Sequence, residues 1–134
     1  MSQRRSLEQE RAKAAREFIA GYKDAHKTNK DEQGKMRSLA LGAPAEIQMI
    51  GLGQALAFWR AKANKPSEKH HKKFYDSVSR WVTMRITANE NDLLLEWIMN
   101  AASTSDYRRA TSETLSFIKW LKYFAEGELE KGKP

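Results

Sequence analysis

Cysteine is absent from this sequence of 134 residues. Without thiols the chain can form no disulfide, no cysteine-ligated zinc site and no cysteine nucleophile. Long apolar runs are absent as well. No stretch approaches the roughly 18 residues of a membrane-spanning helix, and none follows the basic first residues as it would in a signal peptide. We therefore expect a soluble, cytoplasmic protein without a membrane partner.

Proline and β-branched residues are also scarce, and both shortages favour helices. The three prolines, Pro44, Pro66 and Pro134, each fall at an expected helix boundary or at the end of the chain. β-branched residues never alternate with polar ones over the length of a strand, so we expect no β-sheet. The length fits one domain, residues 1–134, in which residues 1–6 and 127–134 are expected to be flexible. The predicted fold is all-α, a compact bundle of five to six helices.

Apolar side chains at helical spacing predict where the helices lie. They cover about residues 7–27, 35–41, 45–62, 68–85, 92–101 and 105–129. Ser6 and Gln9 have the spacing of a capping box for the first helix, and Asn91 is the expected cap of the fifth. The polar segment 28–34 is expected to separate the first two helices. Core spacing is also found for Trp81, Trp97, Trp120 and Phe117, which we expect inside the bundle and not stacked on bases.

The third predicted helix contains two glycines. Gly42 is expected to end the helix before it, and Pro44 is expected to open it. Gly51 and Gly53 then fall inside an apolar helical run, where each costs about 1 kcal/mol relative to alanine. Close approach of a neighbouring helix would compensate, whereas a phosphate-binding glycine loop needs a strand before it and a helix after it. We therefore interpret the two glycines as a packing contact.

Histidine offers little for catalysis or metal binding. His70 and His71 are adjacent, so on a helix their side chains point about 100° apart and lack the i, i+4 spacing of a zinc-binding pair. The lysines around them indicate that both lie on a solvated basic face. No serine, cysteine or carboxylate is paired with a base in a catalytic pattern. The sequence therefore predicts no metal, no cofactor and no catalytic residue, and we expect that the chain is not an enzyme.

Positive charge is the strongest functional signal. The formal net charge is +7, and residues 60–85 carry eight Lys or Arg against two acidic residues. Residues 86–134 carry six basic residues against eight acidic ones, so the excess lies in the first two-thirds of the chain. Basic stripes on helices suit a phosphate backbone, which is bound through its charge. The candidate RNA-binding residues are Arg16, Lys23, Lys27, Lys69, Lys72, Lys73, Arg80, Arg108, Arg109, Lys119 and Lys122.

Three stretches together resemble one family. The first comprises residues 35–39 (KMRSL), Pro44 and residues 51–58 (GLGQALAF), and it resembles a central helix that a proline initiates. The second runs from Tyr75 to residues 81–82 (WV). The third includes residues 107–108 (YR) and 119–125 (KWLKYFA) and resembles a C-terminal helix. In this order and spacing, the stretches are similar to the small subunit of the type III-B CRISPR (Cmr) effector complex.

The resemblance implies an all-helical subunit of an antiviral-defence ribonucleoprotein, without catalytic activity of its own. Its implied partners are crRNA and target RNA, whose duplex it lines as a filament of copies of itself. The repeated backbone subunit and the large polymerase-like subunit of the Cmr complex are further implied partners. Two alternatives remain open: a protein-only helical adaptor without RNA contact, and the small subunit of the related type III-A complex. A helix-turn-helix DNA binder fits less well, because the third predicted helix is too apolar for a recognition helix.

Overall fold

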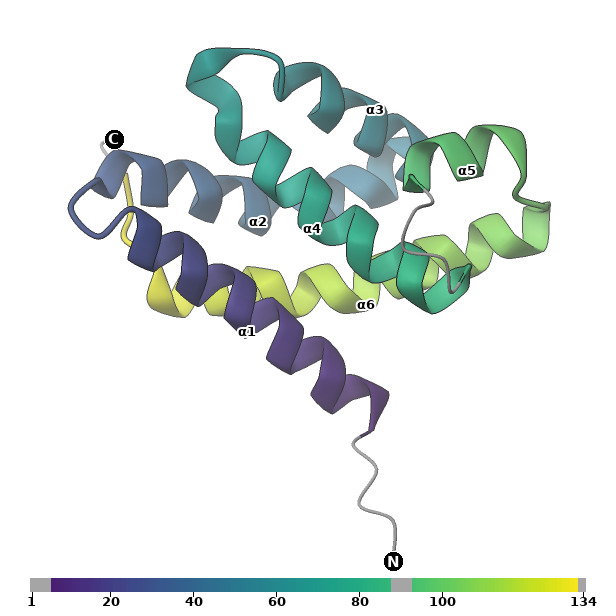
Figure 1. The fold of residues 1–134 in the computed structure, drawn as a ribbon, viewed down its shortest axis with the longest axis horizontal. Helices are drawn as coiled ribbons and strands as arrows, with labels where there is room; N and C mark the ends of the chain where they lie inside the picture. Colours follow the sequence, from purple (N-terminus) through teal and green to yellow (C-terminus); the bar gives the residue numbers. More distant parts are fainter. Residues whose placement is uncertain (1–5, 88–92, 133–134) are drawn as a thin grey trace, which may run out of the picture.

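The computed structural model describes residues 6–87 and 93–132, and every regular element within these ranges is helical (Figure 1). The elements are α1 (Leu7–Ala25), α2 (Lys30–Ile50), α3 (Leu52–Lys62), the short 3₁₀ helix η1 (Pro66–Glu68), α4 (Lys69–Ile86), α5 (Leu94–Asn100) and α6 (Thr104–Glu128). The predicted all-α bundle of five to six helices is confirmed. Within the described ranges, no helix has both the length and the apolar character needed to cross a membrane.

Capping boxes fix the starts of two helices. The Ser6 hydroxyl accepts from the Gln9 amide at 3.2 Å, and the Ser6 amide donates to Gln9 Oε1 at 2.8 Å, as the sequence predicts. Ser103 and Asp106 form the same reciprocal pair at the start of α6. Each box satisfies amides that have no partner within the helix. The predicted cap Asn91 lies outside the described residues, and α5 begins at Leu94.

The predicted break between the first two helices exists, but residues 28–34 overstate its extent, because α1 ends at Ala25 and α2 begins at Lys30. Asn29 is its N-cap, and the Asn29 Oδ1 accepts from the Glu32 amide at 3.1 Å. Asp31 and Glu32 occupy the first turn, where carboxylates interact favourably with the helix dipole. The polarity that suggested a loop is therefore the signature of a helix N-terminus.

The predicted boundary at Gly42 and Pro44 is wrong, since α2 continues through both residues to Ile50. Pro44 lacks an amide hydrogen, so the helix gives up one backbone bond there, while the proline ring is buried. The chain breaks instead at Gly51, whose φ of 87° and ψ of 158° lie in a region that is essentially restricted to glycine. The Gly51 amide closes α2 on Ile47, and the Gly51 carbonyl accepts from Ala55 in α3.

One hydrophobic core joins all six α-helices. α1 lies along α6, α2 packs on α6 as well, and α4 crosses between them and α3 (Figure 1). The largest fully buried side chains include Ile19, Met36, Trp59, Phe74 and Phe117, one from each of the five longest helices. At the centre of α1, Ala15 and Ile19 are buried, while Ala14 and Phe18 are half-buried.

The segment after α6 packs against α2. Leu129 is buried, and the Glu130 amide donates to Gln33 Oε1 at 3.0 Å. Gln33 is itself buried and donates from Nε2 to the carbonyl of His26 at 2.8 Å. The end of α1, the start of α2 and the end of α6 are thus joined through one glutamine. Residues 127–132, expected to be a flexible tail, make these contacts. Of the expected flexible N-terminus, only the cap Ser6 is described.

Candidate nucleic-acid interface

The structure places all eleven predicted RNA-binding residues at the surface. Ten of them are exposed, and Lys122 is half-buried. Three have ion-pair partners. Arg16 lies 3.3 Å from Glu128, Lys72 lies 2.9 Å from Asp76, and Arg109 lies 3.8 Å from Asp106. Among the described residues, no carboxylate pairs with the other eight, which are Lys23, Lys27, Lys69, Lys73, Arg80, Arg108, Lys119 and Lys122. Their charges remain available to a polyanion.

A groove of about 780 Å³ runs between α1 and α4. It is lined by Ala14, Glu17 and Phe18 of α1, by Lys73, Asp76, Ser77, Arg80, Trp81, Met84 and Arg85 of α4, and by Phe117 of α6. We call this the α1–α4 groove. Trp81 and Phe117 stack with ring centroids 5.1 Å apart and planes 12° apart. Both aromatic rings belong to the packed interior, as their spacing predicts, so they form the groove wall.

Of the predicted cations, only Lys73 and Arg80 lie in the α1–α4 groove. They are seven residues apart on α4, so helical geometry puts them two turns apart on one side of the helix. Glu17 and Asp76 also line the groove, and Asp76 is already paired with Lys72. The predicted cations of α6 do not line it. Two of the eleven predicted residues therefore line this groove, and the other nine lie elsewhere on the surface.

Arg85 also lines the groove, although it is not among the predicted residues. Its guanidinium lies 4.6 Å from the centre of the Trp81 ring and forms an ion pair with Glu10 of α1. A cation over a tryptophan face is stabilised by the ring quadrupole. The i, i+4 spacing of Trp81 and Arg85 was visible in the sequence, but the Glu10 contact depends on how α1 packs.

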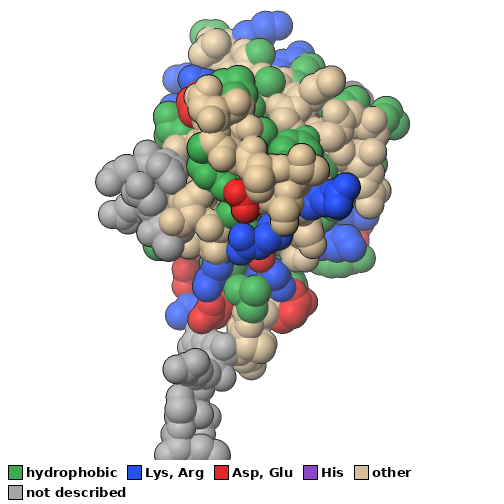
Figure 2. All heavy atoms as spheres, turned by 90° about the vertical axis from the view of Figure 1, so that its right-hand side faces the viewer, with side chains coloured by type: hydrophobic (Ala, Val, Ile, Leu, Met, Phe, Trp, Pro, Cys, Tyr) green, Lys and Arg blue, Asp and Glu red, His purple; other side chains and the backbone are tan. Residues whose placement is uncertain are grey.

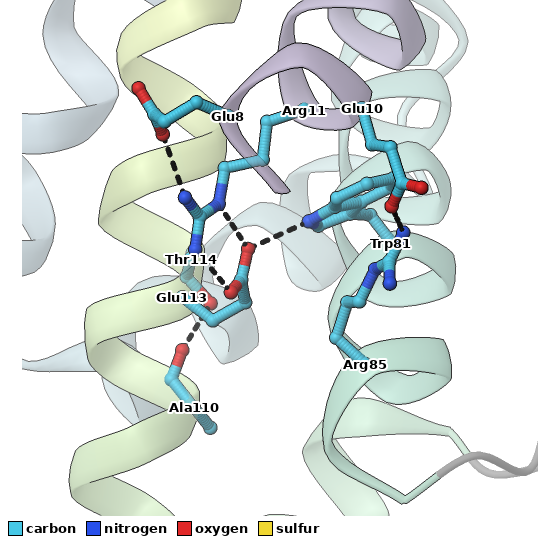
Figure 3. Close-up of polar contacts among 8 residues, drawn as sticks. All are labelled: Glu8, Glu10, Arg11, Trp81, Arg85, Ala110, Glu113 and Thr114. Atoms are coloured by element: carbon cyan, nitrogen blue, oxygen red, sulfur yellow. Dashed lines mark hydrogen bonds and ion pairs between the residues drawn. The ribbon is translucent and has the colours of Figure 1, made fainter. Parts of the chain in front are cut away.

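A buried ion-pair network holds the groove walls together (Figure 3). Arg11 of α1 donates two hydrogen bonds to Glu113 of α6, at 2.8 and 2.7 Å, and a third to Glu8. The Trp81 indole donates to the same carboxylate at 2.9 Å. Burial alone would raise the pKa of Glu113, but the hydrogen bonds from Arg11 and Trp81 outweigh it and lower this pKa. The network joins α1, α4 and α6 at one point, so its role is structural.

The surface is not basic on every side. On the face in Figure 2, basic and acidic side chains lie next to each other in the lower half, and hydrophobic side chains lie among uncharged atoms above, with further basic side chains along the upper edge. Several large apolar side chains are exposed elsewhere on the chain, including Met49 at 82% and Tyr123 at 62%. The charges of α6 include Lys122, whose ammonium lies 5.8 Å from the Tyr123 ring. Mixed surface of this kind suits contacts with protein as well as with phosphate.

The histidines do not lie on a solvated face, so that interpretation is wrong. His70 and His71 are buried at the start of α4, against the end of η1. One ligand atom from each of Glu68, His70 and His71 lies within 4.8 Å of the other two. Burial and the nearby His71 lower the pKa of His70 to about 4, and burial also lowers the pKa of His71. The sequence interpretation failed because it rested on the lysines around the histidines, whereas burial of His70 and His71 depends on how the start of α4 packs in the bundle.

Known proteins share this fold and sequence. The family model for CRISPR-associated protein (Cas_Cmr5) matches residues 7–128, which span α1 to α6. The chain is also similar to the crystal structure of a CRISPR-associated Cmr5 family protein from Thermus thermophilus. Sequence identity is 28% and the TM-score is 0.70, over 94% of this chain and 100% of that one. These matches confirm the resemblance to the small subunit of the type III-B Cmr complex. The chain belongs to the Cmr5 family of CRISPR-associated proteins.

Proposed function

We propose that this small subunit holds the crRNA–target RNA duplex of the Cmr complex by its sugar–phosphate backbone, without catalysing a reaction. Family membership supports a small structural subunit that associates with the other Cmr subunits. RNA contact and stacking of copies along the duplex are the further steps of the proposal. The observation that supports RNA contact is the α1–α4 groove. Lys73 and Arg80, which have no ion-pair partner among the described residues, line one wall of this groove.

Lys73 and Arg80 are the main phosphate contacts in this proposal. Both are exposed, and neither has a carboxylate within ion-pairing distance in the part of the chain that the structure describes. An unpaired cation gives up no protein contact when it binds a phosphate, whereas Arg85 would have to leave Glu10. A duplex presents phosphates at regular intervals, and their recognition requires charge but no base contact. The proposal therefore predicts binding that is independent of RNA sequence.

The remaining unpaired cations would extend the contact surface. Lys23 lies in the last turn of α1 and Lys27 just after this helix, and Lys119 and Lys122 lie in the second half of α6. They are not part of the α1–α4 groove. In a stack of copies along a duplex, such charges would face either the RNA or the next subunit. The exposed apolar side chains Met49 and Tyr123 suit the contacts between subunits.

The test is charge reversal in the assembled complex. The variant Lys73→Glu/Arg80→Glu is compared with Lys65→Glu/Lys131→Glu, which changes net charge equally at exposed residues outside the groove. RNA affinity is measured over a salt series. The groove variant should bind RNA more weakly, and its salt slope should fall by about one for each lost phosphate contact. The control should bind like the wild type.

The protein-only adaptor makes the opposite prediction. In that case both variants bind RNA equally well within the complex, and incorporation of the subunit depends on the partner surface alone. An unchanged salt slope for the groove variant, with the subunit present at its normal amount, contradicts the RNA-holding proposal. Random-sequence and defined duplexes should give the same result, since backbone contacts do not distinguish bases.

A further inference from the structure

Glu68, His70 and His71 lie at the junction between η1 and α4, away from the α1–α4 groove. Glu68 Oε2 is 3.4 Å from His70 Nε2 and 3.0 Å from His71 Nδ1. Ligand atoms of a tetrahedral zinc site, with bonds of about 2.0 to 2.1 Å, are about 3.3 Å apart. The two measured separations differ from this spacing by a few tenths of an ångström. The Glu68 carboxylate is therefore already at ligand spacing from both histidines, and all three ligand atoms lie within 4.8 Å of one another.

One nitrogen of each histidine is buried without a hydrogen bond in the described part of the chain. His71 Nδ1 is buried and makes no hydrogen bond, even though Glu68 is close, and His70 Nδ1 is buried without a partner among the described residues as well. A buried polar atom without a hydrogen bond is destabilising, and ordinary native structures contain few of them. For His71 Nδ1, coordination to a metal ion would supply the missing partner. The unpartnered His71 Nδ1 is the atom that such a ligand would satisfy.

We propose that Glu68, His70 and His71 form a binding site for a divalent transition-metal ion of the zinc class. Two imidazoles and one carboxylate are a known ligand set for zinc, which then keeps a fourth position open for water. The site borders a hollow of about 940 Å³ that residues of α2 also line, so an ion and its water can enter from solvent. The site is independent of the proposed RNA contact.

Nearby charges affect how tightly the site binds a cation. The carboxylates of Glu68 and Glu32 favour a cation at the site, whereas Lys35 and Lys62 oppose it. The Lys35 ammonium is held by Glu32 at 3.1 Å and by the Ser67 carbonyl at 3.1 Å.

Zinc titration of the tag-free full chain at neutral pH, followed by calorimetry, tests the proposal. The wild type should bind one zinc ion, and Glu68→Gln and His71→Asn should each weaken binding about tenfold or more. His26→Gln removes the histidine outside the cluster and should bind like the wild type. Lys35→Gln, which removes an opposing charge, should bind more tightly. Circular dichroism of each variant shows whether it is folded, and Glu68→Gln is the mildest change because that side chain is half-buried.

Side-chain nitrogen spectra of the histidines provide a second readout. The signals of His70 and His71 should shift together with added zinc and return after chelation, while the His26 signals stay unchanged. Absence of binding to the wild type would overturn the proposal. Binding that survives in Glu68→Gln and His71→Asn, or that is lost in His26→Gln, would overturn it too.

Discussion

Glu113 is a carboxylate in a place that favours apolar residues, the inner face of α6. Only 9% of its side chain is exposed, and it accepts from both Arg11 and Trp81. Removing a buried charge from water is costly unless its hydrogen bonds are satisfied. Here the bidentate Arg11 guanidinium and the Trp81 indole donate hydrogen bonds to the carboxylate and offset this desolvation cost. The protein is therefore destabilised only when one of the partners is lost. Sequence reasoning did not find the network, because its members stand at positions 11, 81 and 113 and meet only through packing.

Glu113→Ala should therefore lower the free energy of unfolding by about 3 kcal/mol, as expected for an unpaired buried charge. The variant leaves the Arg11 guanidinium, which is 14% exposed, with only Glu8 as a partner among the described residues. Urea unfolding followed by circular dichroism measures the change. Glu8→Ala is the matched control, because Glu8 is 60% exposed and its loss should cost less than about 0.5 kcal/mol. Equal effects of the two substitutions would contradict the structural role of the network.

The same carboxylate should also make stability depend on pH. The pKa of Glu113 is lower in the folded state than in the unfolded chain. The contribution of Glu113 to the free energy of unfolding is complete above its pKa in the unfolded chain, which is about 4.3. This contribution is lost as the pH falls through the lower pKa of the folded state. Unfolding free energies between neutral pH and pH about 3 should therefore fall less steeply for Glu113→Gln than for the wild type. Glu8→Gln, which removes an exposed carboxylate, is the control, and a slope unchanged in Glu113→Gln contradicts the assignment.

At the scale of elements, close backbone packing between α2 and the segment after α6 explains a glycine. An added Cβ at Gly34 would lie 2.2 Å from the amide nitrogen of Gly132 and 2.3 Å from its Cα. Backbone atoms cannot move aside as a flexible side chain can. The nearby bond from the Glu130 amide to Gln33 depends on the same approach. Gly34 is therefore required for the segment after α6 to pack against α2.

Gly34→Ala should destabilise the protein, although alanine favours a helix by about 1 kcal/mol over glycine. The steric conflict should outweigh the propensity and expose the amide of Glu130, which hydrogen exchange detects. Gly21→Ala is the matched control, because that glycine also lies in a helix but has nothing within 4 Å of an added Cβ. It should stabilise the chain by about 0.5 to 1 kcal/mol. If both substitutions increased the stability of the protein, the C-terminal segment would not pack tightly on α2.

The sequence predicted the type of the elements better than their boundaries. The predicted helix over about residues 68–85 matches α4, because amphipathic periodicity reflects burial directly, as the buried Phe74, Val78 and Val82 show. Pro44 misled the prediction, since proline favours a helix start but a buried ring can also be accommodated inside a helix. Gly51 was assigned to a helix interior, because no local signal distinguishes a packing glycine from one with a positive φ.

The candidate site was predicted less completely, and for a physical reason. Sequence identifies which residues are charged and which face of a helix they share, so Lys73 and Arg80 were found. It does not show which charges are neutralised by distant partners, such as Arg16 by Glu128. It also missed Arg85, whose position depends on α1. Pairing across elements is decided by tertiary packing, which local patterns do not contain.

At the scale of the whole molecule, the helices share one core, and Trp residues lie on four of them. Trp59, Trp81, Trp97 and Trp120 belong to α3, α4, α5 and α6. We expect the chain to unfold as one domain in a single cooperative transition, as is usual below about 150 residues. Tryptophan fluorescence and far-ultraviolet circular dichroism should then give superimposable urea curves. Two separate midpoints would show that part of the bundle unfolds independently.

The packing of α1 on α6 also bears on how the chain is made. Arg11 and Glu113 are 102 positions apart, and α1 and α6 form the most extensive helix pair. Ribosomes add roughly 5 to 20 residues per second, so the first helix emerges about 5 to 20 seconds before its partner. During that interval the apolar face of α1 has no α6 to cover it. Completion of the native core is therefore delayed until α6 has been synthesised, and in that interval the apolar face of α1 is open to a chaperone.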